Sequence, residues 1–262
     1  MRESLDRIVS QFDSQTESIR RQLALIDYLG RGGAPLEGLA ISKTQAKNMS
    51  VIAKGMATFI SSDMKVVIQN GSVIIVSAFF EEAVRSLVRD SLMVVSRKHK
   101  RFNDLSVSIQ KSQINAFGAR FSEMKSASDL FQVEYITHIE NMLACARNAE
   151  GYALLSPDIA NNKNNLRSGE LTEMCSRIGL KGIWEKISAR KELQDHFGQY
   201  NPKFVMSEAT NRLNLFIDTR NELIHFNPVA ATYGRAWVES EMEFLRTVVA
   251  CAAAVMDEHF VE

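Results

Sequence analysis

The sequence predicts an all-α protein, and its composition and periodicity both support this. Proline is scarce, with only Pro35, Pro157, Pro202 and Pro228 among 262 residues, while residues that favour helices are plentiful. Apolar residues recur at helical spacing over several long segments. With 45% hydrophobic residues, the chain is long enough to bury a sizeable core.

The first predicted helix covers residues 3–29, because Leu5, Phe12, Ile19 and Ile26 recur every seven residues. The stretch GRGGAP at 30–35 predicts a linker. We therefore divide the chain into an N-terminal amphipathic helix with its linker, residues 1–35, and a helical domain, residues 36–262.

The most apolar long helix is predicted at 63–97. Its β-branched run VVIQNGSVIIV resembles a strand, but the segment FFEEAVRSLVRDSLMVV continues it with helical periodicity. The remaining predicted elements are helices at about 42–61, 130–149, 170–178, 183–194, 203–226 and 230–260, short helices and loops at 98–129, and a polar loop at 161–169.

The charge balance and the cysteine content argue against a globally basic nucleic-acid-binding protein and against a disulfide-stabilised protein. Because 31 basic residues balance 31 acidic ones, any nucleic-acid site must be local. The widely spaced Cys145, Cys175 and Cys251 predict neither a disulfide framework nor a metal site, and we expect no cofactor. No apolar run approaches the ~20 residues of a membrane span. The sequence therefore predicts a soluble, cytoplasmic protein.

The segment FIDTRNELIHF at 216–226 carries the most specific chemistry in the chain. On a helical wheel, Arg220 points into the middle of an apolar arc, whereas Asn221 and His225 lie one turn apart on the polar face. The apolar arc comprises Leu213, Phe216, Ile217, Leu223 and Ile224, and the polar face also includes Asn214, Asp218 and Glu222. An arginine placed there needs a carboxylate or a phosphate as its partner.

The structural interpretation is that Arg220 pairs with Glu81 or Glu82 of the 63–97 helix and that His225 is an exposed histidine near a helix end. The functional interpretation comes from resemblance. Arg220, Asn221 and His225 resemble the Arg-polar-x-x-x-His motif of the HEPN superfamily. The resemblance extends to the RiboL-PSP subgroup of this superfamily and covers about residues 60–262. Three segments carry it: SAFFEEAVRSLVRDSL, NNKNNLRSG followed by Gly179 and Leu180, and RNELIHFNP. The family's aromatic-Glu-x-Phe pattern reads FFEEAV here, so either Glu81 or Glu82 corresponds to its glutamate.

The resemblance implies an all-α HEPN-like bundle with an additional N-terminal helix, and a metal-independent endoribonuclease of the toxin or defence type. Histidine can serve as acid and base near neutral pH, and a guanidinium can stabilise the charge on a phosphorane. Arg220 lies about 140° from His225 on the wheel, so a homodimer with a composite site is expected. The implied partners are RNA and an antitoxin or defence-system protein.

Other interpretations stay open. The chain could be a catalytically silent HEPN module that binds RNA, a nucleotide or a protein, or a purely structural helical dimer. The basic cluster RKHKR at 97–101 is either a solvated helix end or a contact for RNA phosphates. Arg147 and Asn148 repeat the Arg-Asn pair, but Tyr152 stands where the histidine would be. His138, His196 and His259 lack metal-ligand spacing, and Gly30, Gly32 and Gly33 lack the context of a phosphate loop.

Overall fold

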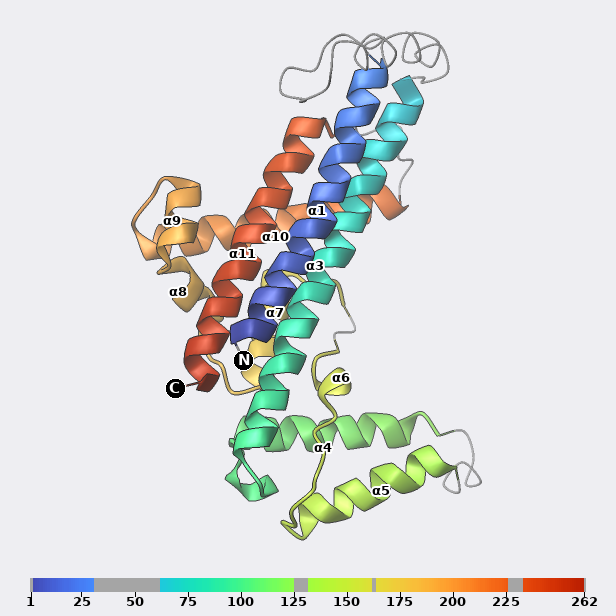
Figure 1. The fold of residues 1–262 in the computed structure, drawn as a ribbon, viewed down its shortest axis with the longest axis vertical. Helices are drawn as coiled ribbons and strands as arrows, with labels where there is room; N and C mark the ends of the chain where they lie inside the picture. The colour runs from blue at the N-terminus through green and yellow to red at the C-terminus, as the bar shows by residue number, and fades with distance from the viewer. Residues whose placement is uncertain (1, 31–61, 125–131, 162–163, 226–232, 262) are drawn as a thin grey trace. The chain divides into compact units, whose positions relative to one another are not determined.

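The computed structural model describes residues 2–30, 62–124, 132–161, 164–225 and 233–261 (Figure 1). Over these ranges the chain forms α-helices and one short 3-10 helix, with no β-strand. The all-α prediction is therefore confirmed. The helix expected at 42–61 and the predicted domain boundary at residue 35 lie outside the described residues.

The chain divides into two compact units. Unit 1 comprises residues 1–10, 81–214 and 247–262, and unit 2 comprises residues 11–80 and 215–246. Four helices contribute to both units because the borders fall within them: α1 (Arg2–Gly30), α3 (Ser62–Lys98), α10 (Pro202–His225) and α11 (Arg235–Val261). The predicted division into residues 1–35 and 36–262 stays a prediction.

Unit 1 contains the C-terminal part of α3 and a series of shorter helices. Val84, Leu87, Val88 and Leu92 of α3 are completely buried. Helix α3 is continuous from Ser62 to Lys98, which confirms a helix where the β-branched run at 66–76 resembled a strand. The shorter elements are η1 (Phe102–Asp104), α4 (Val107–Ser122), α5 (Val133–Ala146), α6 (Ser156–Ile159), α7 (Ser168–Arg177), α8 (Ile183–Ser188) and α9 (Lys191–Phe197). Helix α4 contacts α5, α6 and α7, and α8 contacts both α7 and α9.

Two parts of unit 1 differ from the predicted elements. The segment expected to form short helices and loops contains the 16-residue helix α4, whose N-cap Ser106 accepts a hydrogen bond from the backbone NH of Ile109. Ile109, Gln113 and Phe117 bury one side of α4 at four-residue spacing. The single helix expected at 183–194 is broken between α8 and α9, where Arg190 adopts an extended conformation.

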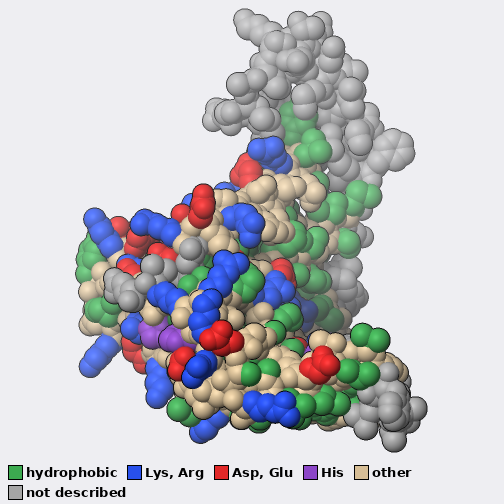
Figure 2. Space-filling model, turned by 60° about the horizontal axis from the view of Figure 1, so that its bottom comes forward, with side chains coloured by type: hydrophobic (Ala, Val, Ile, Leu, Met, Phe, Trp, Pro, Cys, Tyr) green, Lys and Arg blue, Asp and Glu red, His purple; other side chains and the backbone are tan. Residues whose placement is uncertain are grey.

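Helix α5 is apolar, yet it contributes little to the core. Cys145 is its one buried side chain among those described. Four of its apolar side chains are exposed: Val133, Ile136, Met142 and Leu143. Hydrophobic side chains are among those on the face of the protein drawn in Figure 2.

Unit 2 is built from α1, α3, α10 and α11. Its core includes Phe12, Ile19 and Leu23 of α1, Val73 and Phe80 of α3, Phe216 and Ile217 of α10, and Met242 and Leu245 of α11. The helix predicted at 3–29 is thus confirmed, with its seven-residue spacing on the buried side.

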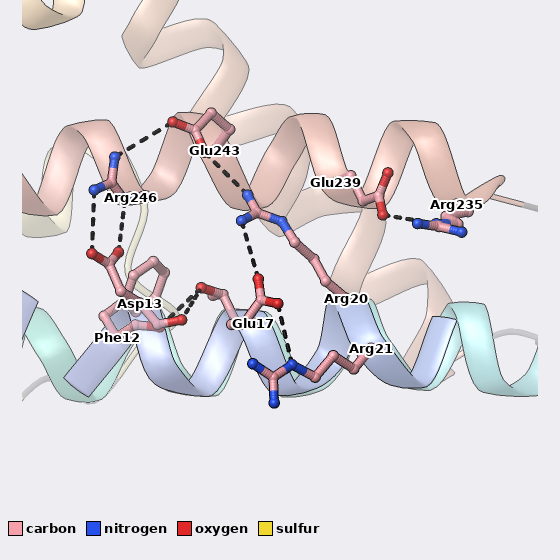
Figure 3. A network of polar contacts seen from close by, with 10 residues as sticks. Phe12, Asp13, Glu17, Arg20, Arg21, Arg235, Glu239, Glu243 and Arg246 are labelled. Atoms are coloured by element: carbon pink, nitrogen blue, oxygen red, sulfur yellow. Dashed lines mark hydrogen bonds and ion pairs between the residues drawn. The ribbon is translucent and has the colours of Figure 1, made fainter. Parts of the chain in front are cut away.

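Ion pairs join α1 to α11 along the surface of unit 2 (Figure 3). Arg246 forms a fork onto Asp13, with Nε 2.7 Å from Oδ1 and Nη2 3.2 Å from Oδ2. Arg20 Nη2 lies 3.1 Å from Glu243 Oε2. Because each of these side chains is about a third or more exposed, the pairs stabilise the contact less than the apolar core beneath them.

None of the described helices is long and apolar enough to cross a membrane.

Candidate functional site

The predicted site lies on the last turns of α10. The helix starts with Pro202, whose fixed backbone angle suits a first helical turn, and its last residue is His225. Leu213, Phe216, Ile217 and Leu223 are buried, as the wheel predicted. Ile224 is the exception: it belongs to the apolar arc of the wheel but is 44% exposed. As the penultimate residue of α10, it lies where the helix provides little further cover.

Aromatic packing fixes this part of α10 against the start of α11 within unit 2. The ring of Phe216, one turn before Arg220, stacks on Trp237 with ring centroids 6.3 Å apart. Tyr233 in turn packs on Trp237 at 4.6 Å. Stacked aromatic rings bury a large area in a defined geometry. The motif residues therefore project from a packed helix.

Arg220 and Asn221 are hydrogen-bonded to each other. Arg220 Nη1 donates to Asn221 Oδ1 at 3.0 Å, and both side chains are partly buried. His225 is exposed, so a substrate can reach its ring.

Asn221 lies between the other two motif residues. It accepts from Arg220 through its carbonyl oxygen and stands four residues before His225, on the same side of the helix. An amide has two NH donors besides its carbonyl oxygen. The arrangement thus places a cation, amide donors and an imidazole in order along one turn of α10.

Glu81 and Glu82, the predicted supporting acids, both have arginine partners on α3. Glu81 Oε2 lies 3.2 Å from Arg85 Nη2, and its Oε1 accepts from the backbone NH of Leu166 at 3.4 Å. Glu82 pairs with Arg89. Both carboxylates belong to unit 1 and Arg220 belongs to unit 2. The pairing of Arg220 with Glu81 or Glu82 therefore stays a prediction.

The end of the asparagine-rich loop is attached to three helices of unit 1, which the sequence did not indicate. Asn214 Oδ1 of α10 accepts from the backbone NH of Ser168 at 3.0 Å. Trp184 Nε1 of α8 donates to the carbonyl of Ser168 at 2.9 Å, and Glu81 of α3 accepts from Leu166. Glu81 thus positions the loop, a role that depends on a long-range backbone contact.

A buried carboxylate on α11 was also missed. Glu241 belongs to unit 2 and is only 6% exposed. A sequence signal existed, because Glu241 falls within the apolar stripe of α11, three residues after Val238 and four before Leu245. Acidic side chains are rarely buried so completely in proteins.

The fold disfavours reactions that need a cysteine thiolate. Cys145, Cys175 and Cys251 are buried free thiols. Burial raises the pKa of Cys175 to about 12 and that of Cys251 to about 11, so these thiols stay protonated at neutral pH. Within the described ranges, no three His, Cys, Asp or Glu side chains form a group that could hold a metal ion.

The all-α fold and the position of Arg220, Asn221 and His225 on the long helix α10 agree with the resemblance to the HEPN superfamily. The family model for RiboL-PSP-HEPN matches residues 45–253, and the chain belongs to this family, which is associated with nuclease or RNA-related functions. The match includes all of α3 and α10 but not α1. No curated protein and no solved structure matches the chain.

Proposed function

We propose that the protein is a metal-independent endoribonuclease of the toxin or defence type. The observation that carries this proposal is the order of groups on α10, where the Arg220 guanidinium is bonded to Asn221 and the exposed His225 ring lies one turn further on. Membership of the RiboL-PSP-HEPN family supports the same reaction class. RNA is the proposed substrate, and the cytoplasm is the proposed compartment because the three buried cysteines are free.

In the proposed reaction, a 2′-hydroxyl of RNA attacks the neighbouring phosphorus atom. The imidazole of one His225 takes the hydroxyl proton, and a protonated imidazole returns a proton to the departing 5′-oxygen. Arg220 stabilises the charge of the phosphorane, and Asn221 orients the guanidinium and the phosphate. The bond to the 5′-oxygen breaks, leaving a 2′,3′-cyclic phosphate and a 5′-hydroxyl end.

The proposed site is composite and belongs to a homodimer. When both proton transfers occur in one step, one neutral and one protonated imidazole are needed at the same time, and the two copies of His225 supply them. An isologous interface between two α10 helices would bring both copies of the motif to one phosphate. An antitoxin or defence-system partner would regulate access to this site.

The decisive experiment is cleavage of single-stranded RNA in EDTA by the purified protein. We expect cyclic-phosphate and 5′-hydroxyl products, and His225→Ala should lower the rate by at least about 10², the lower end of acid–base catalysis. Glu222→Gln is the matched control, because Glu222 is an exposed residue of the same helical turn. Its rate should equal that of the unmodified protein.

The melting temperature of His225→Ala should stay unchanged, because the side chain is exposed. Cleavage that persists in His225→Ala, or that disappears with chelator, would contradict the mechanism. Failure to cleave any RNA would favour the catalytically silent binding module instead.

A further inference from the structure

Several exposed cations of unit 1 lie at the ends of helices far from one another in sequence. They occur just after or at the end of α3, around the start of α8 and in the last turn of α11. We call this set the basic end: Lys98, Lys100, Arg101, Lys181, Lys186 and His259. All six side chains are exposed.

Two contacts bring these segments together. Lys98 Nζ donates to the carbonyl of Phe260 at 2.6 Å, which joins the end of α3 to the end of α11. The ring of His259 hydrogen-bonds the backbone of Gly179, in the turn between α7 and α8. That turn also approaches α4 closely, since a Cβ on Gly179 would lie 3.1 Å from Ser106 Oγ, and its φ of +89° favours glycine.

The surface between α8 and α11 is hollowed. A depression of about 540 Å³ is lined by Lys186, Arg190, Glu258 and His259, with Ala189 and Val255 as its apolar part. Arg190 and Glu258 neutralise each other through a 2.7 Å ion pair. Lys186 is therefore the lining cation left to meet an anion.

Positive charge is in excess around this depression. Lys100, Arg101, Lys181 and Lys186 form no ion pair with another described residue. Burial and the charge of Lys186 lower the pKa of His259. The acidic residues of the same turns are Asp104, Glu185, Asp257 and Glu258, and Glu258 is already paired with Arg190, so the lysine and arginine side chains stay in excess. On the face drawn in Figure 2, Lys and Arg side chains lie beside histidine side chains.

We propose that the basic end of unit 1 binds phosphates of single-stranded RNA, in addition to the phosphate proposed to react at the Arg220–His225 motif. The inference rests on the proposed function for the identity of the polymer. Ammonium groups bind phosphate as point charges, and neutralised phosphates release counterions. Cations on three turns extend beyond the lining of the depression, which suits a chain of phosphates better than a single anion. Because the whole chain has no net charge, this local excess of positive charge would direct RNA to the basic end.

The test compares two triple variants in a His225→Ala background, so that binding is measured without cleavage. The first is Lys100→Gln, Lys181→Gln and Lys186→Gln. The matched control is Lys111→Gln, Arg147→Gln and Lys203→Gln, which removes three positive charges from other exposed positions of unit 1. Anisotropy of a fluorescent single-stranded RNA gives the dissociation constant between about 50 and 200 mM NaCl.

The first triple variant should bind about tenfold more weakly, and its slope of log affinity against log salt should fall by about 2, or about 0.7 for each lost contact. The control triple variant should keep the slope of the parent. Equal changes in both triples, no change in either, or no RNA binding by the parent would overturn the proposal. A fluorescent mononucleotide that competes as well as RNA would also overturn it, by showing a small-anion site.

Cleavage is scored separately with His225 intact, using a short RNA that spans only the motif. If that substrate is not cleaved but the two triple variants still differ in their salt slopes, the proposed nuclease activity is contradicted and RNA binding by the basic end is supported. If it is cleaved but the two triple variants bind RNA alike, RNA binding by the basic end is contradicted and the proposed nuclease activity is supported.

Discussion

At the scale of single residues, Asn221 joins the chemistry of Arg220 to that of His225. Its carbonyl oxygen holds one guanidinium nitrogen at 3.0 Å, which restricts where the remaining NH groups can point. A guanidinium presents donors in a planar fork, whereas an ammonium is a compact point charge. The type of cation at position 220 should therefore influence the reaction, beyond the charge alone.

Arg220→Lys should lower the rate of RNA cleavage by about 10², a loss comparable with removal of one donor from a charge-stabilising site. The lysine keeps the charge but cannot hold Asn221 and a phosphate with one planar group. Single-turnover kinetics would measure the rate, and circular dichroism would confirm that the variant is folded. A rate equal to that of the unmodified protein would show that only the charge matters.

At the scale of elements, α1 combines a buried apolar side with an exposed row of ion pairs. It lies before the residues that the family match covers, yet it supplies part of the core of unit 2. Phe12 is 1% exposed, whereas the neighbouring Asp13 faces Arg246 with 36% of its side chain exposed. Burial removes apolar area from water, while solvent screens an exposed pair. The buried apolar side of α1 should therefore contribute more to the free energy of unfolding than its exposed ion pairs do.

Phe12→Ala should lower the free energy of unfolding by about 3 to 5 kcal/mol, because it leaves a cavity in the core. Asp13→Asn should lower it by at most about 1 kcal/mol. Urea titrations followed by circular dichroism would compare the two variants, and added salt should reduce the effect of Asp13→Asn alone. Equal losses would show that the ion pairs hold α1 in place.

At the scale of the whole molecule, the proposed activity requires two copies of the chain. Helix α5 offers a competing apolar surface, because Ile136 and Leu143 are exposed on it. A dimer formed through α5 is thus an alternative to the proposed dimer formed through α10. The interface, as well as the mass of the particle, must therefore be measured.

Light scattering at micromolar concentration should give the mass of a dimer. Glu222→Cys, on the motif turn, should then cross-link the two copies under mild oxidation, and Ile136→Cys on α5 is the matched control. The three native cysteines are buried, so they should not compete for the cross-link. A monomer, or a dimer that cross-links only through Ile136→Cys, would contradict the composite site.

The sequence by itself determined the helices, most of their buried sides and the motif on α10. Helical periodicity, the glycine breaks and the order Arg220, Asn221 and His225 are local properties, so they can be read from neighbouring residues. The family resemblance read from the same residues is confirmed by the match over 45–253. Local patterns also placed His225 correctly at an exposed helix end.

The tertiary structure decided what depends on segments distant in sequence. It alone showed that Asn214 binds the backbone of Ser168, that α5 stays largely outside the core, and that Lys98 reaches Phe260. Glu81 bonding to Leu166 is a further example, since no local pattern fixes which backbone group approaches a side chain. Such contacts form only when helices pack, because their geometry depends on the crossing of whole elements rather than on spacing along one of them.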